Sequence, residues 1–283
     1  MSKLYQRLDS PHFDYRLSTV PGAGELLFRG PVPDFEAPFI AFIGGAQTFG
    51  RFVPETFADL LGKRLAMPVL NLSIGGAGPR FGLLPPIRRI LARARLVVVQ
   101  FYSGRSTSNS LIDNSKSGRN SGRVRATGEE RLTEAVFAEV FKTGDQAYIA
   151  KIVREMREDY IAAMNEFARV IGVPAVALWF SRRKPDYVTE YGDMFGINNL
   201  FPQLLDREVV DRVRPQLAGY VECITKVGIP QRLWRASEAV EGTLLGADGW
   251  LWNEYYPSPE MHRVAADQLE PVLRRLLAEP AKR

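Results

Sequence analysis

Basic side chains follow the ends of five short apolar segments in this chain. These cations are Arg51, Arg80, Arg105, Arg182, Arg183, Lys184 and Lys226. An arginine presents a planar fork that pairs with carboxylate, sulfate or phosphate through two hydrogen bonds. If the segments are parallel strands, the residues after them gather at one edge of a sheet, where α/β proteins bind ligands. The pattern predicts an anion site, although 37 lysines and arginines in 283 residues also place cations on loops without any site.

Two glycine turns accompany the first two segments. The apolar run 39–43 ends at Gly44 and Gly45, and the run 68–72 is followed by Gly75 and Gly76. An apolar run that stops at a glycine turn before a helical pattern is typical of a buried parallel strand entering a βα loop. The segment 39–50 therefore predicts the strand and turn around which the fold is organised.

The remaining segments extend this pattern along the chain. We expect strands at 39–43, 68–72, 96–102, 175–180 and 220–225. Hydrophobic periodicity predicts helices at 52–65, 81–94, 146–171 and 259–277, and Thr127 with Glu130 has the spacing of a helix capping box. Strands that alternate with helices predict an α/β fold with a parallel sheet, and the flavodoxin-like order 2-1-3-4-5 is the natural topology.

Composition changes define the expected organisation. Residues 1–38 are rich in proline, glycine and aromatics, and we interpret them as an extended N-terminal arm packed on a single domain of residues 39–283. A polar loop at 103–126 and a polar, aromatic insertion at 181–216 interrupt that domain. The loop carries five cations and one acid, so it could close over an anion or be a surface loop without a role. It lacks interleaved aromatics, which disfavours a nucleic-acid platform.

Several classes of protein are excluded by composition. The single cysteine, Cys223, excludes a disulfide framework, and no Cys/His cluster suggests zinc, so we expect neither metal nor cofactor. We identify no signal peptide and no apolar run long enough to span a membrane, and we therefore expect a cytoplasmic protein. A net charge of +5 favours anionic ligands but is too small to indicate nucleic acid.

Three sequence blocks resemble those of the SGNH/GDSL hydrolases. FIGGAQTFG resembles the first block, NLSIGGAG the second, and YYPSPEMHRVAADQL the terminal block with its helix. The chain is also similar to a group of bacterial proteins with the same YYPSPEMH ending. The resemblance implies a three-layer α/β/α fold with the strand order 2-1-3-4-5.

The same resemblance places the catalytic triad on residues that cannot perform its chemistry. It puts the nucleophile at Ala46, the acid at Asn253 and the base at Tyr256. Alanine has no oxygen to attack with, asparagine carries no negative charge, and an unperturbed tyrosine is a poor base at neutral pH. The backbone amides of Ala46 and Gly76 could still serve as oxyanion donors, and the third donor position, which in the family is an asparagine, remains open between Arg105 and Asn109.

We therefore predict a degenerate SGNH-like protein that binds an anionic small molecule or carbohydrate at the C-terminal edge of the sheet. The candidate ligand-binding residues are Gln47, Arg80, Ser103, Arg105, Arg182 and Arg183. The resemblance suggests a role in bacterial surface-polysaccharide metabolism, and the aromatic stretch 250–256 could stack on a sugar or pack in the core.

The alternative is an esterase or acyltransferase of SGNH type with a relocated nucleophile. Ser73, Ser103 or Ser106 would then act with His262, although a histidine in that place is more often part of a helix face. The oligomeric state stays open.

Overall fold

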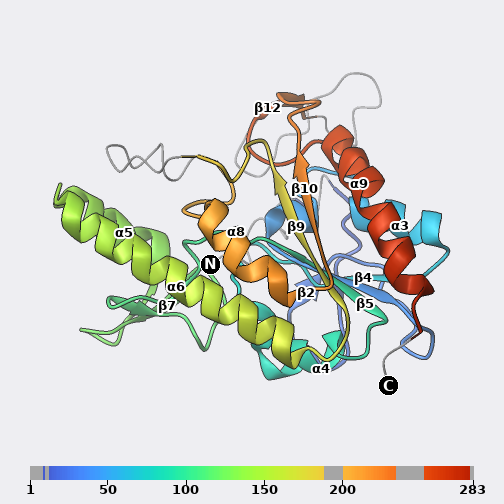
Figure 1. Cartoon of the computed structure of the whole chain (residues 1–283), viewed down its shortest axis with the longest axis horizontal. Coiled ribbons are helices and arrows are strands. Elements are labelled where there is room, and N and C mark those ends of the chain that lie inside the picture. Colours follow the sequence, from blue (N-terminus) through green and yellow to red (C-terminus); the bar gives the residue numbers. More distant parts are fainter. Residues whose placement is uncertain (1–8, 10–12, 188–199, 234–251, 281–283) are drawn as a thin grey trace.

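The computed structural model describes residues 9, 13–187, 200–233 and 252–280, and its centre is a five-stranded parallel sheet (Figure 1). The strands are β3 (Ile40–Ile43), β4 (Val69–Asn71), β5 (Leu96–Gln100), β9 (Ala175–Ser181) and β10 (Gly219–Ile224). Their order is β10-β9-β5-β3-β4, and each neighbouring pair is parallel. The predicted order 2-1-3-4-5 is confirmed.

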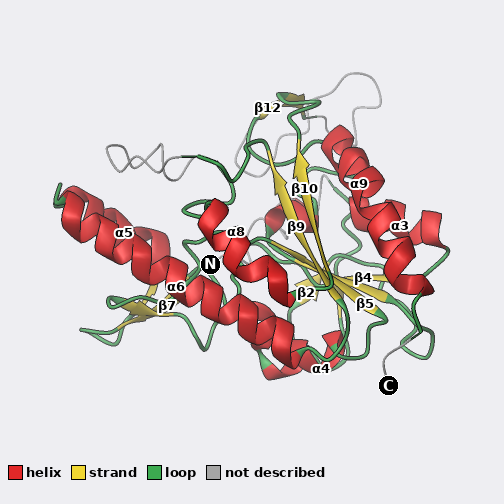
Figure 2. Cartoon of the chain, viewed as in Figure 1, coloured by secondary structure: helices red, strands yellow, loops and turns green. Residues whose placement is uncertain are grey.

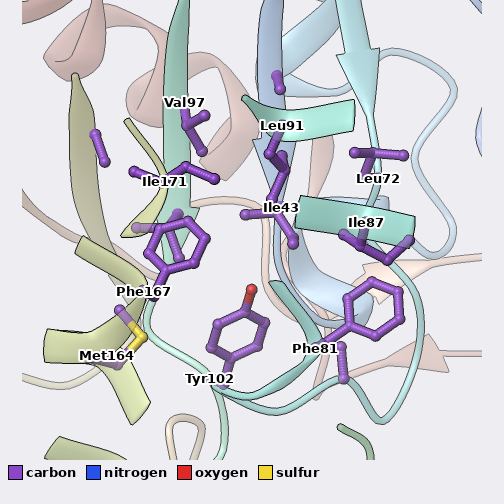
Figure 3. Packing of buried hydrophobic residues seen from close by; sticks show 14 of the residues in the cluster. Ile43, Leu72, Phe81, Ile87, Leu91, Val97, Tyr102, Met164, Phe167 and Ile171 are labelled. Carbon is purple, nitrogen blue, oxygen red and sulfur yellow. The ribbon is translucent and has the colours of Figure 1, made fainter. Parts of the chain in front are cut away.

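Helices cover both faces of this sheet, as Figure 2 shows. One face packs on α4 (Pro85–Leu91), α6 (Gln146–Val170) and α8 (Arg207–Val213), and the other on α3 (Phe57–Leu65) and α9 (Pro259–Ala278). Successive residues of β3 and β5 alternate between the two cores, as the pleat of a strand requires. Figure 3 shows the first core, in which Phe81, Tyr102 and Phe167 group near Ile43.

Two of the predicted helices begin elsewhere in the structure. The prediction that 52–65 is one helix was wrong, because Phe52 has a φ of 66° and the helix α3 starts only after Thr56, which forms a capping box with Asp59. A separate short helix, α2 (Ala46–Phe49), precedes Phe52. The predicted helix 81–94 is divided into η1 (Phe81–Leu83) and α4 by the proline at position 85.

Much of the predicted polar loop 103–126 is folded. β6 (Ile112–Asp113), β7 (Ser121–Val124) and β8 (Glu130–Leu132) form an antiparallel sheet, which we call the inserted sheet. It leads into α5 (Thr133–Lys142), and Figure 1 shows α5 and β7 at the end of the molecule away from α9. The capping box predicted at Thr127 was wrong, because a hairpin turn through Gly128, with a φ of +75°, joins β7 to β8 there.

The described part of the N-terminal segment packs against the exit of β3. It contains β1 (Ser18–Thr19) paired with β2 (Leu27–Phe28), and the rings of Phe13 and Tyr15 contact Phe52 and Phe49. The remaining elements are η2 (Arg214–Gln216) and the antiparallel pair β11 (Gln231–Arg232) and β12 (Trp252–Asn253). Among the described helices none combines the length and apolar character that crossing a membrane requires.

Candidate functional site

The turn after β3 is held by side chains from two neighbouring strands. Gln100, at the end of β5, accepts hydrogen bonds from the Gly45 N–H at 3.1 Å and the Thr48 hydroxyl at 2.7 Å. Asn71, at the end of β4, donates to the Thr48 carbonyl at 3.0 Å. A Cβ on Gly44 would lie 2.5 Å from the Gln100 carboxamide oxygen, so only glycine fits. The turn is therefore held from two neighbouring strands, and Ala46, the first residue after it, occupies the predicted nucleophile position.

Asn253, at the predicted acid position, stabilises its own turn. The buried Asn253 carboxamide accepts from the Tyr255 N–H at 3.1 Å and the Tyr256 N–H at 2.8 Å. Its amide nitrogen donates to the Tyr256 carbonyl and to Gln231, both at 2.9 Å. These four hydrogen bonds make Asn253 a local support for the terminal block.

Tyr256, at the predicted base position, contacts a buried ion pair. Arg51 pairs with Asp9 at 2.7 Å and donates to the Tyr256 hydroxyl at 3.2 Å. Burial disfavours the charge of Arg51, but hydrogen bonds with Asp9 and Tyr256 keep its pKa above the usual value. The guanidinium also lies 4.6 Å from the Phe52 ring centroid and 5.1 Å from that of Tyr256. The Tyr256 hydroxyl is thus committed to a charge-compensated pair that the arm residue Asp9 completes.

His262 is a buried residue of the α9 core. Its ring stacks on Phe57 and meets Phe180 edge-on, and its Nδ1 accepts a hydrogen bond from the Phe57 N–H at 3.0 Å. Burial lowers the pKa of the imidazole to about 3, so it is neutral at physiological pH. Within the described residues, it forms no hydrogen bond with a serine hydroxyl. Of the serines predicted as relocated nucleophiles, Ser73 is fully buried and Ser106 nearly so.

Three of the predicted ligand-binding residues come together around Tyr255. We call this group the Tyr255 cluster, and its members are Ser103, Arg105, Arg183, Gln203 and Tyr255. Gln203 donates to the Tyr255 hydroxyl at 2.6 Å, and its carbonyl accepts the Gly104 N–H at 2.9 Å, which ties the cluster to the exit of β5. Burial raises the pKa of Tyr255, while the nearby charge of Arg105 opposes that shift.

The two arginines of the cluster are held differently. Arg105 pairs with Glu134 of α5 at 2.9 Å and donates to Ser103. Arg183 donates to the Pro202 carbonyl and lies 3.7 Å from the Tyr187 ring centroid, and its Nε is buried without a hydrogen-bond partner among the described residues. Burial lowers the pKa of Arg183. No carboxylate of the described residues pairs with it.

The other predicted residues lie outside this cluster. Arg80 forms an ion pair with Asp159 of α6, and the Asn109 side chain accepts the N–H groups of Leu111 and Ile112 in a turn. Gln47 is almost completely buried in α2, and Arg182 is half-buried. In the aromatic stretch, Trp252 is 50% exposed on β12, whereas Trp250 lies outside the described residues.

The turn after β4 receives an asparagine that the sequence did not single out. The Asn120 N–H donates to the Gly76 carbonyl at 2.7 Å, and a Cβ on Gly76 would lie 2.4 Å from the Asn120 carboxamide oxygen. Gly76 has a φ of +75°, which also favours glycine. Asn120 lies between polar residues of the predicted loop, so composition alone did not distinguish it.

Metal binding finds no support in the described part of the chain. No group of three histidine, cysteine, aspartate or glutamate side chains lies close enough there to hold a metal ion.

Several solved structures are similar in chain path. A carbohydrate esterase family 2 enzyme from Myceliophthora fergusii has a TM-score of 0.44 and 12% identity, covering 88% of this chain and 68% of that chain. A family two carbohydrate esterase from Clostridium thermocellum, in complex with cellohexaose, has a TM-score of 0.43 and 12% identity over 89% and 67%. A phospholipase A1 from Streptomyces albidoflavus has a TM-score of 0.39 and 12% identity over 84% and 99%.

Comparison of the sequence with known proteins and protein families identifies a family. No curated protein matches this chain. A family model described as "Domain of unknown function (DUF6473)" matches residues 4–141 and 129–277. Together these segments span most of the molecule, including every element of the central sheet, and the chain belongs to the DUF6473 family.

Proposed function

We propose that this protein binds a small anionic molecule or an acidic carbohydrate at the C-terminal edge of the sheet, without hydrolysing it. The observation that carries the proposal is Arg183. Its guanidinium is partly buried beside Tyr255 and has no carboxylate partner in the described structure. A partly buried cation that lies, among the described residues, beside a carbonyl and aromatic side chains but no carboxylate favours an anion nearby.

The surrounding groups suit an oxygen-rich ligand. Ser103 and Tyr255 offer hydroxyl groups, and Arg105 approaches Tyr255 from the exit of β5, the strand next to β9. Convergent polar groups from several strand exits are the usual way in which an α/β protein orients a small ligand.

The residues at the predicted triad positions favour ligand binding over hydrolysis. Ala46 supplies no nucleophile, Asn253 is saturated by hydrogen bonds in its own turn, and the Tyr256 hydroxyl is engaged by Arg51. If the ligand is an acidic sugar, a role in bacterial surface-polysaccharide metabolism would follow.

Isothermal titration calorimetry with glucose, glucuronate and glucose 6-phosphate tests the ligand class. We expect the charged sugars to bind at least tenfold more tightly than glucose, with an affinity that falls as salt rises. Arg183→Gln should remove this preference, while Arg182→Gln, its neighbour in sequence, should keep most of it. Equal affinity of glucose and the charged sugars would contradict the proposal.

A fluorophosphonate probe tests the absence of hydrolysis. We expect intact-mass spectrometry to show no adduct after incubation. A stoichiometric adduct on Ser73, Ser103 or Ser106, mapped by peptide digestion, would establish the esterase or acyltransferase alternative instead.

A further inference from the structure

A further arginine, from α6, lies next to the Tyr255 cluster. The Arg157 Nε donates to the carbonyl of Leu204 at 2.7 Å, and Leu204 directly follows the cluster residue Gln203. Burial lowers the pKa of Arg183 most, and the positive charge of Arg157 lowers it further. The two guanidinium groups are therefore within electrostatic range of each other.

Carboxylates compensate the neighbouring arginines but not Arg183. Arg157 forms an ion pair with Asp206 at 2.6 Å, and both side chains are 17% exposed. Arg105, at the exit of β5, forms an ion pair with Glu134 at 2.9 Å. Within the described part of the chain, no carboxylate pairs with Arg183. Three arginines and two carboxylates, counted over the described residues, thus leave one uncompensated positive charge at the cluster.

A single uncompensated charge determines which anion fits best. A singly charged group, such as a carboxylate or a sulfate ester, would compensate Arg183 and leave no net charge in the partly buried site. A phosphate monoester carries about two negative charges at pH 8, because its second pKa is about 6. It would therefore bring one uncompensated negative charge out of water, and such a charge is costly to bury.

We propose that Asp206 and Glu134 are specificity-determining residues, which make the site select a singly charged anionic group over a dianion. They do so by compensating Arg157 and Arg105, whose positive charges a dianion would need. This inference rests on the proposed function for the place of the ligand, and adds a charge selectivity that anion binding alone does not require. Glu134 should contribute less than Asp206, because it is 56% exposed and solvent screens its charge.

Glucose 6-sulfate and glucose 6-phosphate test the inference, because they have nearly the same shape and differ in charge. Isothermal titration calorimetry at pH 8 should show that the wild type binds the sulfate about tenfold more tightly than the phosphate, and both more tightly than glucose. Asp206→Asn should reduce the sulfate-to-phosphate affinity ratio about fivefold, because it frees the charge of Arg157. Asparagine can keep the helix cap that Asp206 forms by accepting the Val209 N–H at 3.2 Å.

A second variant and two controls keep the test independent of one substitution. Glu134→Gln should reduce the ratio about twofold, in the same direction as Asp206→Asn. Glu208→Gln removes a 71% exposed acid from α8, and Arg182→Gln removes the cation that precedes Arg183 in sequence. Both controls should keep the ratio of the wild type, and thermal unfolding checks that every variant is folded.

The outcomes separate this inference from the proposed function. If the sulfate and the phosphate bind equally tightly and both bind better than glucose, the charge selectivity is wrong and the proposed function stands. The charge selectivity is also wrong if folded Asp206→Asn and Glu134→Gln both keep the ratio of the wild type. If neither charged sugar binds better than glucose, the proposed function is wrong, and this inference fails with it.

Discussion

The exits of β3 and β4 lie side by side in the sheet, but their polar groups are used in opposite ways. At the β3 exit, Arg51 is compensated by Asp9 and also engages Tyr256. At the β4 exit, Gly76 and Asn120 touch each other and keep donors without acceptors in the described structure. The first exit resembles a structural core, and the second resembles a binding surface. The comparison teaches that neighbouring strand exits can satisfy their polar groups differently, because each turn is contacted by a different distant segment.

The largest effect on stability is expected at the exit of β3. Asp9→Ala should lower the free energy of unfolding by about 3–5 kcal/mol, because it removes a carboxylate that compensates the buried Arg51 cation. Urea denaturation measures this loss. Asp14→Ala is the control, since Asp14 is exposed on the same segment, and its effect should stay within about 0.5 kcal/mol. A loss of less than about 1 kcal/mol for Asp9→Ala would mean that the pair does not compensate the charge.

At the exit of β4 we expect a smaller loss of stability, caused by crowding around an added side chain. Gly76 and Gly172 both have a φ of +75°, but an added Cβ meets the Asn120 carboxamide at Gly76 and nothing within 4 Å at Gly172. Gly172→Ala should cost about 1–2 kcal/mol from backbone strain alone. Gly76→Ala should cost about 1–3 kcal/mol more, from overpacking. Thermal and urea unfolding measure both losses. If Gly76→Ala and Gly172→Ala lose the same stability, the Asn120 side chain moves away from the added methyl group without cost.

A pH effect of similar size should come from His262. Its pKa is about 3 in the folded state, below the unfolded value of about 6.5, so the unfolded chain binds the proton more tightly. The stabilisation is complete above pH 6.5 and is lost as the pH falls toward 3. As the pH falls from 6.5 to 5, protonation of this group should lower the free energy of unfolding of the wild type by about 2 kcal/mol.

His262→Gln isolates that contribution, because glutamine does not titrate. Urea unfolding at pH 7, 6 and 5 should give the variant a lower stability at pH 7 and a flatter pH dependence than the wild type. Parallel pH profiles for the two proteins would refute the assignment of a neutral, buried imidazole.

The smallest effect on stability is expected from Tyr256, at the predicted base position. Tyr256→Phe removes the hydroxyl that accepts a hydrogen bond from Arg51 and should cost about 1 kcal/mol. Tyr148→Phe on α6 serves as the control, with an expected change below about 0.5 kcal/mol. If Tyr256 instead acts as a base, Tyr256→Phe would abolish a measurable esterase activity, and the contrast between the two exits would fail.

The elements of the sheet follow from local sequence. Apolar runs predicted all five strands within two residues, because parallel strands buried on both faces need continuous apolar side chains. The helix α6 follows from its periodicity, and Asp145 caps its first turn. Both signals are contained in a short window of sequence.

Errors arose where tertiary contacts overrode the local pattern. Phe52 fits the helical period of α3, but it adopts a left-handed conformation and packs its ring on Phe13 and Tyr256 from distant segments. The inserted sheet has the composition of a loop, and its short strands exist through pairing with one another and with the turn at Gly76.

The sequence by itself determined the residue types at the positions where the resemblance predicts a nucleophile and an acid, since Ala46 has no hydroxyl group and Asn253 has no charge whatever surrounds them. It could not determine how each cation is used. Three of the cations form ion pairs with carboxylates of distant segments: Arg51 with Asp9, Arg80 with Asp159 and Arg105 with Glu134. Arg183 forms no ion pair with a carboxylate of the described residues. The partner of a charge is set by segments far apart in the chain, and burial then decides what an absent partner costs. Only the tertiary structure brings those segments together.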